Sequence, residues 1–120
     1  MSELAVALTG NPNTGKSTIF NALTGARQKI GNWPGVTVDK KIGHTHYKGR
    51  AISIVDLPGT YSINARSPEE QIVIDYLTST KLDLVLNVVD SSNIERNLFL
   101  TVQLLEKGIP LLIDLNMQDD

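Results

Sequence analysis

The feature that most constrains this chain is the octapeptide Gly10–Ser17, which reads GNPNTGKS. It fits the pattern G-x-x-x-x-G-K-[ST] and lies between residues 4–9, which predict a buried strand, and residues 16–23, which predict a helix closed by Gly25. Glycines let the backbone curl so that successive N–H groups face phosphate oxygens, and the helix adds the positive end of its dipole. The stretch therefore predicts a phosphate loop; a glycine-rich turn that only resembles the motif is the alternative.

Strand and helix patterns alternate along the rest of the chain. The elements that we expect, in order, are a loop over 26–35, strands over 36–47 and 51–55 joined by a turn, a helix over 68–78, a strand over 82–89, a helix over 92–107 and a strand over 110–115. Ser67 and Ser92 are each followed three residues later by a glutamate, which predicts a capping box at the start of the two later helices. In the last helix we expect apolar positions to face the core: Ile94, Leu98, Val102 and Leu105.

This alternation predicts a single α/β domain over residues 1–120. The sheet is expected to be mostly parallel, with one antiparallel hairpin strand and with helices on both faces. Hydrophobic residues make up 41% of the chain, which favours a packed core over disorder. Eleven basic residues against 13 acidic ones give a net charge of −2, so nucleic acid is not expected as a partner.

Two further motifs follow predicted strands. Asp56–Gly59 reads DLPG and has the form D-x-x-G, in which the carboxylate can hold Mg²⁺ and the glycine N–H can meet a γ-phosphate; an acidic turn is the alternative. Asn116–Asp119 reads NMQD and has the form N-x-x-D. The Asp119 carboxylate can accept two hydrogen bonds from guanine, whereas adenine would leave that charge unpaired. Together the motifs favour GTP over ATP.

Five stretches, GNPNTGKST, NWPGVTV, DLPGTYS, VVDSSNIERNLFLT and NMQD, together resemble the N-terminal G domain of ferrous iron transport protein B (FeoB), a TRAFAC-class GTPase. The resemblance implies a P-loop NTPase fold that here lacks the final strand and the last guanine-contacting loop. It also implies a soluble fragment that in the full-length prokaryotic protein lies at the cytoplasmic face of the inner membrane. Its partners there would be helical and transmembrane domains that transport Fe²⁺, and self-association is left open.

The resemblance assigns the ligands of Mg²⁺ to Ser17, Thr37 and Asp56, and catalysis to Lys16, Thr37 and Gly59. Thr37 would reach the metal only when switch I, the loop around it, folds over the γ-phosphate. The nucleotide is expected to contact Gly10, Asn11, Pro12, Asn13, Thr14, Gly15, Lys16, Ser17, Thr18, Trp33, Pro34, Gly35, Val36, Thr37, Asp56, Leu57, Pro58, Gly59, Asn116, Met117 and Asp119.

Trp33, the only tryptophan, lies in the predicted switch I. We expect it to move with nucleotide state; a permanent hydrophobic anchor for a static loop is the alternative. Some relatives use K⁺ to supply the charge that an arginine gives elsewhere. The resemblance carries that role onto Asn13, with backbone carbonyls near Gly31 and Trp33 as further ligands. A side chain that only stabilises the loop is the alternative for Asn13.

The sequence thus predicts a Mg²⁺-dependent GTPase with slow intrinsic turnover, since Thr60 stands where Ras-like enzymes have a water-orienting glutamine. The resemblance implies that it regulates iron uptake through movement of switch I and switch II. Two alternatives remain: a nucleotide-dependent switch module with negligible hydrolysis, and a ribosome- or RNA-associated GTPase.

Overall fold

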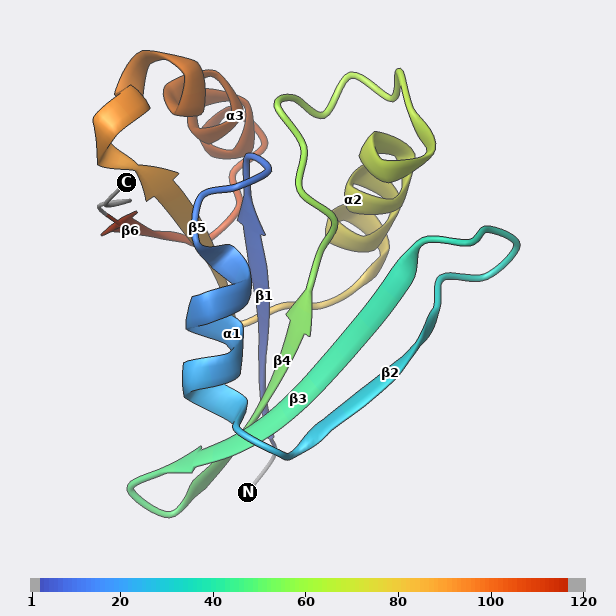
Figure 1. The fold of residues 1–120 in the computed structure, drawn as a ribbon, viewed down its shortest axis with the longest axis vertical. Coiled ribbons are helices and arrows are strands. Elements are labelled where there is room, and N and C mark those ends of the chain that lie inside the picture. Colours follow the sequence, from blue (N-terminus) through green and yellow to red (C-terminus); the bar gives the residue numbers. More distant parts are fainter. Residues whose placement is uncertain (1–2, 117–120) are drawn as a thin grey trace.

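The computed structural model describes residues 3–116 (Figure 1). Its elements, in chain order, are β1 (Leu4–Gly10), α1 (Lys16–Thr24), β2 (Gln28–Asn32), β3 (Asp39–Tyr47), β4 (Arg50–Asp56), α2 (Pro68–Ser79), β5 (Leu84–Asp90), a 3₁₀ turn (Ser91–Asn93), α3 (Ile94–Glu106) and β6 (Leu111–Asn116). Within this range, no helix is both long and apolar enough to cross a lipid bilayer.

The six strands form one sheet in the order β2-β3-β4-β1-β5-β6. β1 runs parallel to β4 and β5, and β6 runs parallel to β5, whereas β3 is antiparallel to both of its neighbours. This confirms the predicted fold class, a mostly parallel sheet with one antiparallel hairpin strand. The carboxyl ends of β1, β4, β5 and β6 meet at one edge of the sheet, where ligands bind in folds of this type.

Helices cover both faces of the sheet (Figure 1). α1 places Phe20 against apolar side chains of three strands: Leu8, Ile54 and Val88. The opposite face carries a larger core formed with α2 and α3, and its fully buried members include Ala7, Val85, Val73, Leu100 and Leu104. Burial of apolar area on both faces fixes the position of the central strand β1, and with it the loop that follows β1.

Residues 28–32 form the strand β2, so the expectation of a loop there was wrong. β2 pairs antiparallel with β3, from Gln28 opposite Gly43 to Asn32 opposite Asp39. Four of its five residues are exposed, so backbone hydrogen bonds at the sheet edge hold the strand rather than side-chain burial. β3 begins at Asp39, three residues later than expected.

Of the two predicted capping boxes, only the one before α2 forms its side-chain cap. The Ser67 hydroxyl accepts a hydrogen bond from the Glu70 amide at 3.1 Å. The second prediction was wrong: Ser92 lies in the 3₁₀ turn, and α3 begins at Ile94. The carboxylate of Asp90 accepts from the amide of Ser92 at 3.0 Å, and this local bond turns the chain before the helix starts.

The predicted core face of α3 was also wrong. The four positions expected to face the core are 40–54% exposed: Ile94, Leu98, Val102 and Leu105. The helix instead buries Asn97, Leu100, Thr101 and Leu104. Thr101 donates to the Asn87 side chain, and Asn97 accepts from the Asp90 amide at 3.1 Å. Because these polar groups are hydrogen-bonded, they can be buried, and the buried face is rotated from the one that the apolar residues alone predicted.

Candidate functional site

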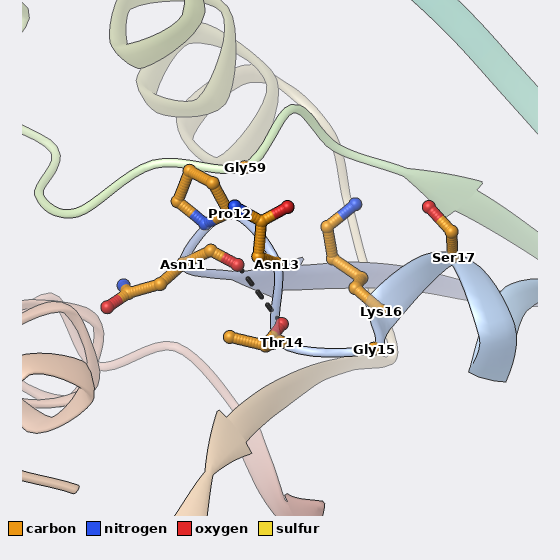
Figure 2. Close-up of a pocket in the computed structure, with 8 residues that line it drawn as sticks. All are labelled: Asn11, Pro12, Asn13, Thr14, Gly15, Lys16, Ser17 and Gly59. Atoms are coloured by element: carbon orange, nitrogen blue, oxygen red, sulfur yellow. Dashed lines mark hydrogen bonds between the residues drawn. The ribbon is translucent and has the colours of Figure 1, made fainter. Parts of the chain in front are cut away.

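A pocket of about 430 Å³ lies at the carboxyl end of β1 (Figure 2). Its walls are Asn11–Ser17, which link β1 to α1, and Gly59, which follows β4. The structure therefore brings together, around one cavity, the centre of the predicted phosphate loop and the glycine of the D-x-x-G motif. The cavity opens at the sheet edge where the strands of a parallel sheet present ligand sites.

The phosphate loop has a fixed backbone shape. Asn13 and Gly15 have φ angles of 65° and 85°, in the left-handed region, and Gly15 is the N-cap of α1. The hydroxyl of Thr14 donates to the carbonyl of Asn11 at 3.0 Å, which closes the loop on itself. Gly10 has no room for a side chain, since a Cβ there would lie 2.7 Å from the carbonyl oxygen of Val88. The loop is curled in the way that a nest of phosphate-binding amides requires.

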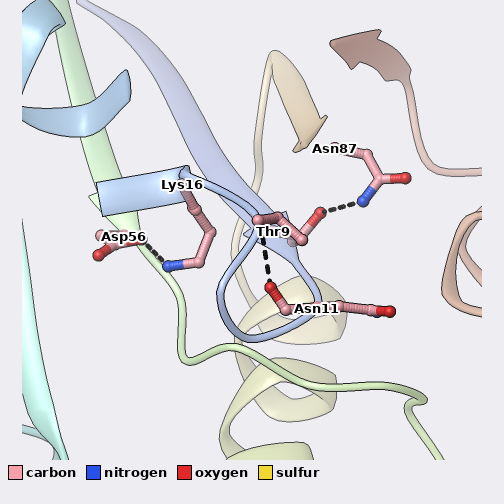
Figure 3. Close-up of polar contacts among 6 residues, drawn as sticks. Thr9, Asn11, Lys16, Asp56 and Asn87 are labelled. Carbon is pink, nitrogen blue, oxygen red and sulfur yellow. Dashed lines mark hydrogen bonds and ion pairs between the residues drawn. The ribbon is translucent and has the colours of Figure 1, made fainter. Parts of the chain in front are cut away.

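Lys16, in the first turn of α1, reaches across to Asp56 at the end of β4 (Figure 3). The Lys16 ammonium and the Asp56 carboxylate form an ion pair, and each residue is only 9% exposed. Removal of either partner would leave a buried unpaired charge. Beside the loop, the amide of Asn87 donates to the Thr9 hydroxyl at 3.3 Å, which ties the end of β1 to β5.

The D-x-x-G segment lies directly against the phosphate loop. The Leu57 amide donates to the carbonyl of Leu8 and the Thr60 amide to that of Gly10, both at 3.0 Å. A Cβ on Gly59 would lie 3.0 Å from Cα of Pro12, so only glycine fits without a shift. The segment does not present all its side chains to the pocket: Leu57 is fully buried in the core.

Of the N-x-x-D motif, the structure describes only the first residue, Asn116. Asn116, at the end of β6, donates from its side-chain amide to the carbonyl of Thr14 at 2.8 Å. It thereby fastens the end of β6 to the phosphate loop. Met117 and Asp119, the other predicted base contacts, lie outside the described residues. Thr18 is exposed on α1 and lies outside the pocket lining.

The predicted switch I residues are not at this pocket. Trp33 is only 6% exposed and packs edge-to-face on Tyr76 of α2, with ring centroids 5.6 Å apart. The Lys40 ammonium lies 4.6 Å from the centre of the Trp33 ring. Trp33 and Pro34 line a separate pocket of about 320 Å³ beside α2. In this structure Trp33 is the hydrophobic anchor of its loop.

Three other members of that loop are solvent-facing or only half-buried. Gly35 and Thr37 are exposed, and Val36 is half-buried against the core that contains Trp33. Gly31 lies in β2, where it pairs with Lys40 of β3. The structure therefore does not bring Gly31, Trp33 or Thr37 to Asn13 and Ser17, as the predicted K⁺ and Mg²⁺ sites require.

Burial raises the pKa of Tyr76 above the usual tyrosine value, because the ionised phenolate would lose solvation. Tyr76 is therefore neutral at physiological pH and presents its ring edge-to-face with Trp33. This apolar contact holds the predicted switch I against α2.

Sequence reasoning missed the side chains that hold residues 57–67. One carboxylate oxygen of Glu70 accepts from the Ser62 hydroxyl and from the amides of Asn64 and Arg66, at 3.1, 2.9 and 3.3 Å. The side-chain amide of Asn11 donates to the backbone carbonyl of Thr60 at 2.9 Å. The only signal in the sequence is the placement of Glu70 in the first turn of a helix, where a capping role alone accounts for it.

The family model described as ferrous iron transport protein B matches residues 4–120. The chain belongs to this family. Over 123 aligned residues it is 54% identical to the Fe(2+) transporter FeoB of Shigella flexneri, with 99% of this chain and 16% of that protein covered. The FeoB of Escherichia coli K12 is 53% identical over the same coverage. The chain thus spans less than a fifth of the FeoB relatives it matches.

Solved FeoB structures share the fold. The G domain of the T. maritima FeoB iron transporter is 48% identical, with a TM-score of 0.88, and the match covers 93% of this chain and 70% of that one. A GDP-bound mutant of the S. thermophilus FeoB G domain is 54% identical, with a TM-score of 0.88, over 93% of this chain and 43% of that one. The mixed six-stranded sheet is therefore the FeoB G-domain fold.

Proposed function

We propose that this chain binds GTP and hydrolyses it as the G domain of a prokaryotic ferrous iron transporter, at the cytoplasmic face of the cell membrane. The observation that carries the proposal is the convergence of the phosphate loop, Lys16 and Gly59 on one pocket. The GDP bound to the S. thermophilus relative supports the choice of a guanine nucleotide. Changes in switch I and switch II would regulate Fe²⁺ uptake by the helical and transmembrane domains of the whole protein.

The oxygen donors expected to hold Mg²⁺ have the chemistry that this ion prefers. The hydroxyl of Ser17 and the carboxylate of Asp56 are hard ligands near the pocket, and the hydroxyl of Thr37 would join them only after its loop moves. The buried Asp56 carboxylate has a cationic partner in Lys16, which supports a role for this position in binding positive charge. Bound nucleotide would draw Lys16 toward its phosphates and leave Asp56 to hold the metal, directly or through water. Mg²⁺ there would neutralise charge on the phosphate oxygens.

Completion of that site requires the loop around Thr37 to move, because Trp33 packs against α2 in this structure. A nucleotide with a γ-phosphate would bring Thr37 to the metal and release Trp33 from Tyr76. Since the chain has one tryptophan, its fluorescence reports the surroundings of this ring. We expect a non-hydrolysable GTP analogue to change the emission intensity or wavelength, and an unchanged spectrum in the presence of saturating analogue contradicts the movement.

Hydrolysis would proceed by positioning and electrostatic stabilisation. Lys16, the loop amides and the Gly59 amide would stabilise the charge that develops on the γ-phosphate. Thr60 is only 5% exposed and its carbonyl is already hydrogen-bonded, and its side chain is too short to orient water as a glutamine does. We therefore expect slow intrinsic turnover.

Asn13 is the residue through which K⁺ would act. Its side chain is exposed at the rim of the pocket, so its carbonyl oxygen is available to a monovalent cation. Single-turnover hydrolysis in K⁺ and in Na⁺ tests both points. We expect K⁺ to accelerate the reaction and Asn13→Ala to abolish that response. A chain that binds GTP but shows no turnover in either salt would instead be a switch module, the second candidate that Thr60 favours.

Calorimetric titration of GDP, GTP and ATP into the chain is the experiment that tests the proposed function. We expect GDP and GTP to bind and ATP to bind far more weakly, because a carboxylate at Asp119 would pair with guanine and not with adenine. Equal affinity for ATP contradicts the assignment of the base. Binding of RNA in place of nucleotide would support the ribosome-associated alternative.

A further inference from the structure

Asn11 lines the phosphate pocket, but its side chain is directed elsewhere. It extends from the phosphate loop away from Lys16 (Figure 2), and the residue is only 3% exposed. Its Nδ2 donates to the carbonyl oxygen of Thr60 at 2.9 Å. The side chain thus connects the phosphate loop to the segment that follows Asp56, 49 residues further along the chain.

We infer, on the basis of the proposed GTP hydrolysis, that Asn11 is a positioning residue: its side-chain amide fixes Gly59 and Thr60 so that the Gly59 N–H faces the γ-phosphate. Asn11 itself touches no reacting atom in this assignment. It acts through the main chain of Thr60. Thr60 follows Gly59, whose N–H would contact the γ-phosphate.

Both main-chain polar groups of Thr60 are bonded to the phosphate loop. Its amide donates to the Gly10 carbonyl at 3.0 Å, and its carbonyl accepts from Asn11. The Thr60 N–H belongs to the Gly59–Thr60 peptide, and because that peptide is planar its bond to Gly10 fixes the orientation of the peptide and the position of the Gly59 Cα. The bond from Asn11 holds the next peptide, on the other side of the Thr60 Cα. Gly59 also abuts Pro12, where a methyl group would lie 3.0 Å from a backbone atom. Gly59 is therefore confined between Pro12 and the hydrogen-bonded main chain of Thr60.

Only the Nδ2 group of the Asn11 side chain takes part in the bond to Thr60. Within residues 3–116, the other end, Oδ1, is buried and has no hydrogen-bond partner. A buried polar atom without a partner is costly and rare, so a side chain chosen only for packing would not carry it. The amide remains because its N–H₂ group holds Thr60.

A positioning role and a purely structural role make different predictions for the two nucleotides. The Gly59 amide can meet a γ-phosphate, which GTP has and GDP lacks. Loss of the Asn11 amide should therefore impair the triphosphate complex and hydrolysis, and leave GDP affinity nearly unchanged. A side chain that only stabilised the fold would affect both nucleotides alike.

The test compares Asn11→Asp and Asn11→Ala with the wild-type chain. Aspartate keeps the shape of the side chain but places an acceptor against the Thr60 carbonyl, and alanine removes the group. Asn93→Ala is the matched control, since Asn93 lines a pocket of about 120 Å³ together with Asn11, and among the described residues its side chain makes no capping hydrogen bond. The measurements are single-turnover GTP hydrolysis, the Kd values of GDP and of a non-hydrolysable GTP analogue, and the thermal midpoint of unfolding.

We expect both Asn11 variants to hydrolyse GTP on the order of 10²-fold more slowly, since small misplacements of a stabilising group cost about that much. Their affinity for the GTP analogue should fall more than their affinity for GDP, and the control should match wild type. Unchanged hydrolysis, or an equal loss of affinity for both nucleotides, overturns the inference, as does failure of both variants to fold. If the wild-type chain does not hydrolyse GTP, the proposed function itself fails, and this result is seen before any variant is compared.

Discussion

The two loops that a nucleotide is expected to move, residues 33–38 and residues 57–67, are held to the body of the protein differently. Residues 57–67 place Leu57 and Ile63 in the core and are also held by hydrogen bonds from side chains of other elements, whereas residues 33–38 are held mainly by the packing of one large side chain. A hydrogen bond is directional and is lost when its partners shift by about an ångström. An apolar contact is non-directional and can be exchanged for another. The loop at 33–38 is therefore the one better suited to large movement.

The loop at 57–67 is bonded to two helices and the phosphate loop. Glu70 of α2 accepts three hydrogen bonds from it. Gln103 of α3 accepts from the amide of Ile63 at 2.9 Å and donates to the side chain of Asn64 at 2.8 Å. The Arg96 guanidinium lies 4.2 Å from the centre of the Tyr61 ring. These contacts come from both flanking helices, so the loop cannot shift far without changing them.

The loop at 33–38 has few bonds of this kind. The amide of Trp33 donates to the carbonyl of Val38 at 2.9 Å, and the amide of Val36 donates to that of Trp33 at 3.3 Å. Both bonds are internal to the loop and can travel with it. The indole Nε1 of Trp33 is buried and lacks a hydrogen-bond partner in the part of the chain that the structure describes, so release of the ring would let this group bond to water.

Trp33→Ala removes the apolar contact that holds residues 33–38 and should give the largest loss of stability. The free energy of unfolding should fall by about 3–5 kcal/mol, the usual cost of deleting a buried aromatic ring. Urea denaturation measures it, with Tyr47→Ala as the control because Tyr47 is 65% exposed. A loss no greater than that of the control would show that the ring does not anchor the loop.

Glu70→Ala tests the hydrogen bonds that hold the loop at 57–67. It leaves the hydroxyl of Ser62 and two backbone amides without their charged acceptor, so the free energy of unfolding should fall by about 2 kcal/mol. Glu69→Ala is a close control, since both glutamates lie in the first turn of α2 and share the same favourable interaction with the helix dipole. Equal destabilisation by the two variants would assign the effect to the helix and not to the loop.

Substitution of Tyr76 tests the same apolar contact through pH and should give the smallest change in stability. Since burial raises the pKa of Tyr76, the folded state holds this proton more tightly than the unfolded state. The stability that this difference provides is fully present below the unfolded tyrosine pKa of about 10 and is lost as the pH rises through the higher folded value. Tyr76→Phe should therefore reduce the alkaline loss of unfolding free energy. Urea denaturation between about pH 8 and pH 11 measures it, and identical pH profiles for the two proteins would contradict burial of the phenol.

The sequence predicted the elements whose side chains decide their structure. The strand–loop–helix unit around Lys16, the buried strand β5 and the capped start of α2 were all found near their expected bounds. Each of these carries a local signal: a glycine pattern, a continuous apolar run, or a serine followed by proline and glutamate. The mixed sheet and its two covered faces followed from the order of such elements.

The misses involve structure that other parts of the chain impose. β2 is held by its pairing with β3, and its exposed side chains give no alternating pattern. The buried face of α3 depends on hydrogen bonds to Asn87 and to the Asp90 amide, which no periodicity reveals. The placement of Trp33 on α2 depends on an aromatic partner 43 positions away, Tyr76. The bonds that hold the loop at 57–67 are likewise long-range.

We propose that the curled loop and the Lys16 ammonium together capture the phosphates of a nucleotide. Lys16→Met keeps the length and apolar body of the side chain and removes its charge, and Lys107→Met, at an exposed site next to the end of α3, is the control. Calorimetric titration with GTP should show affinity reduced on the order of 10²-fold for Lys16→Met and unchanged for the control, with both variants folded by thermal melting. Wild-type affinity in a folded Lys16→Met protein would contradict the account.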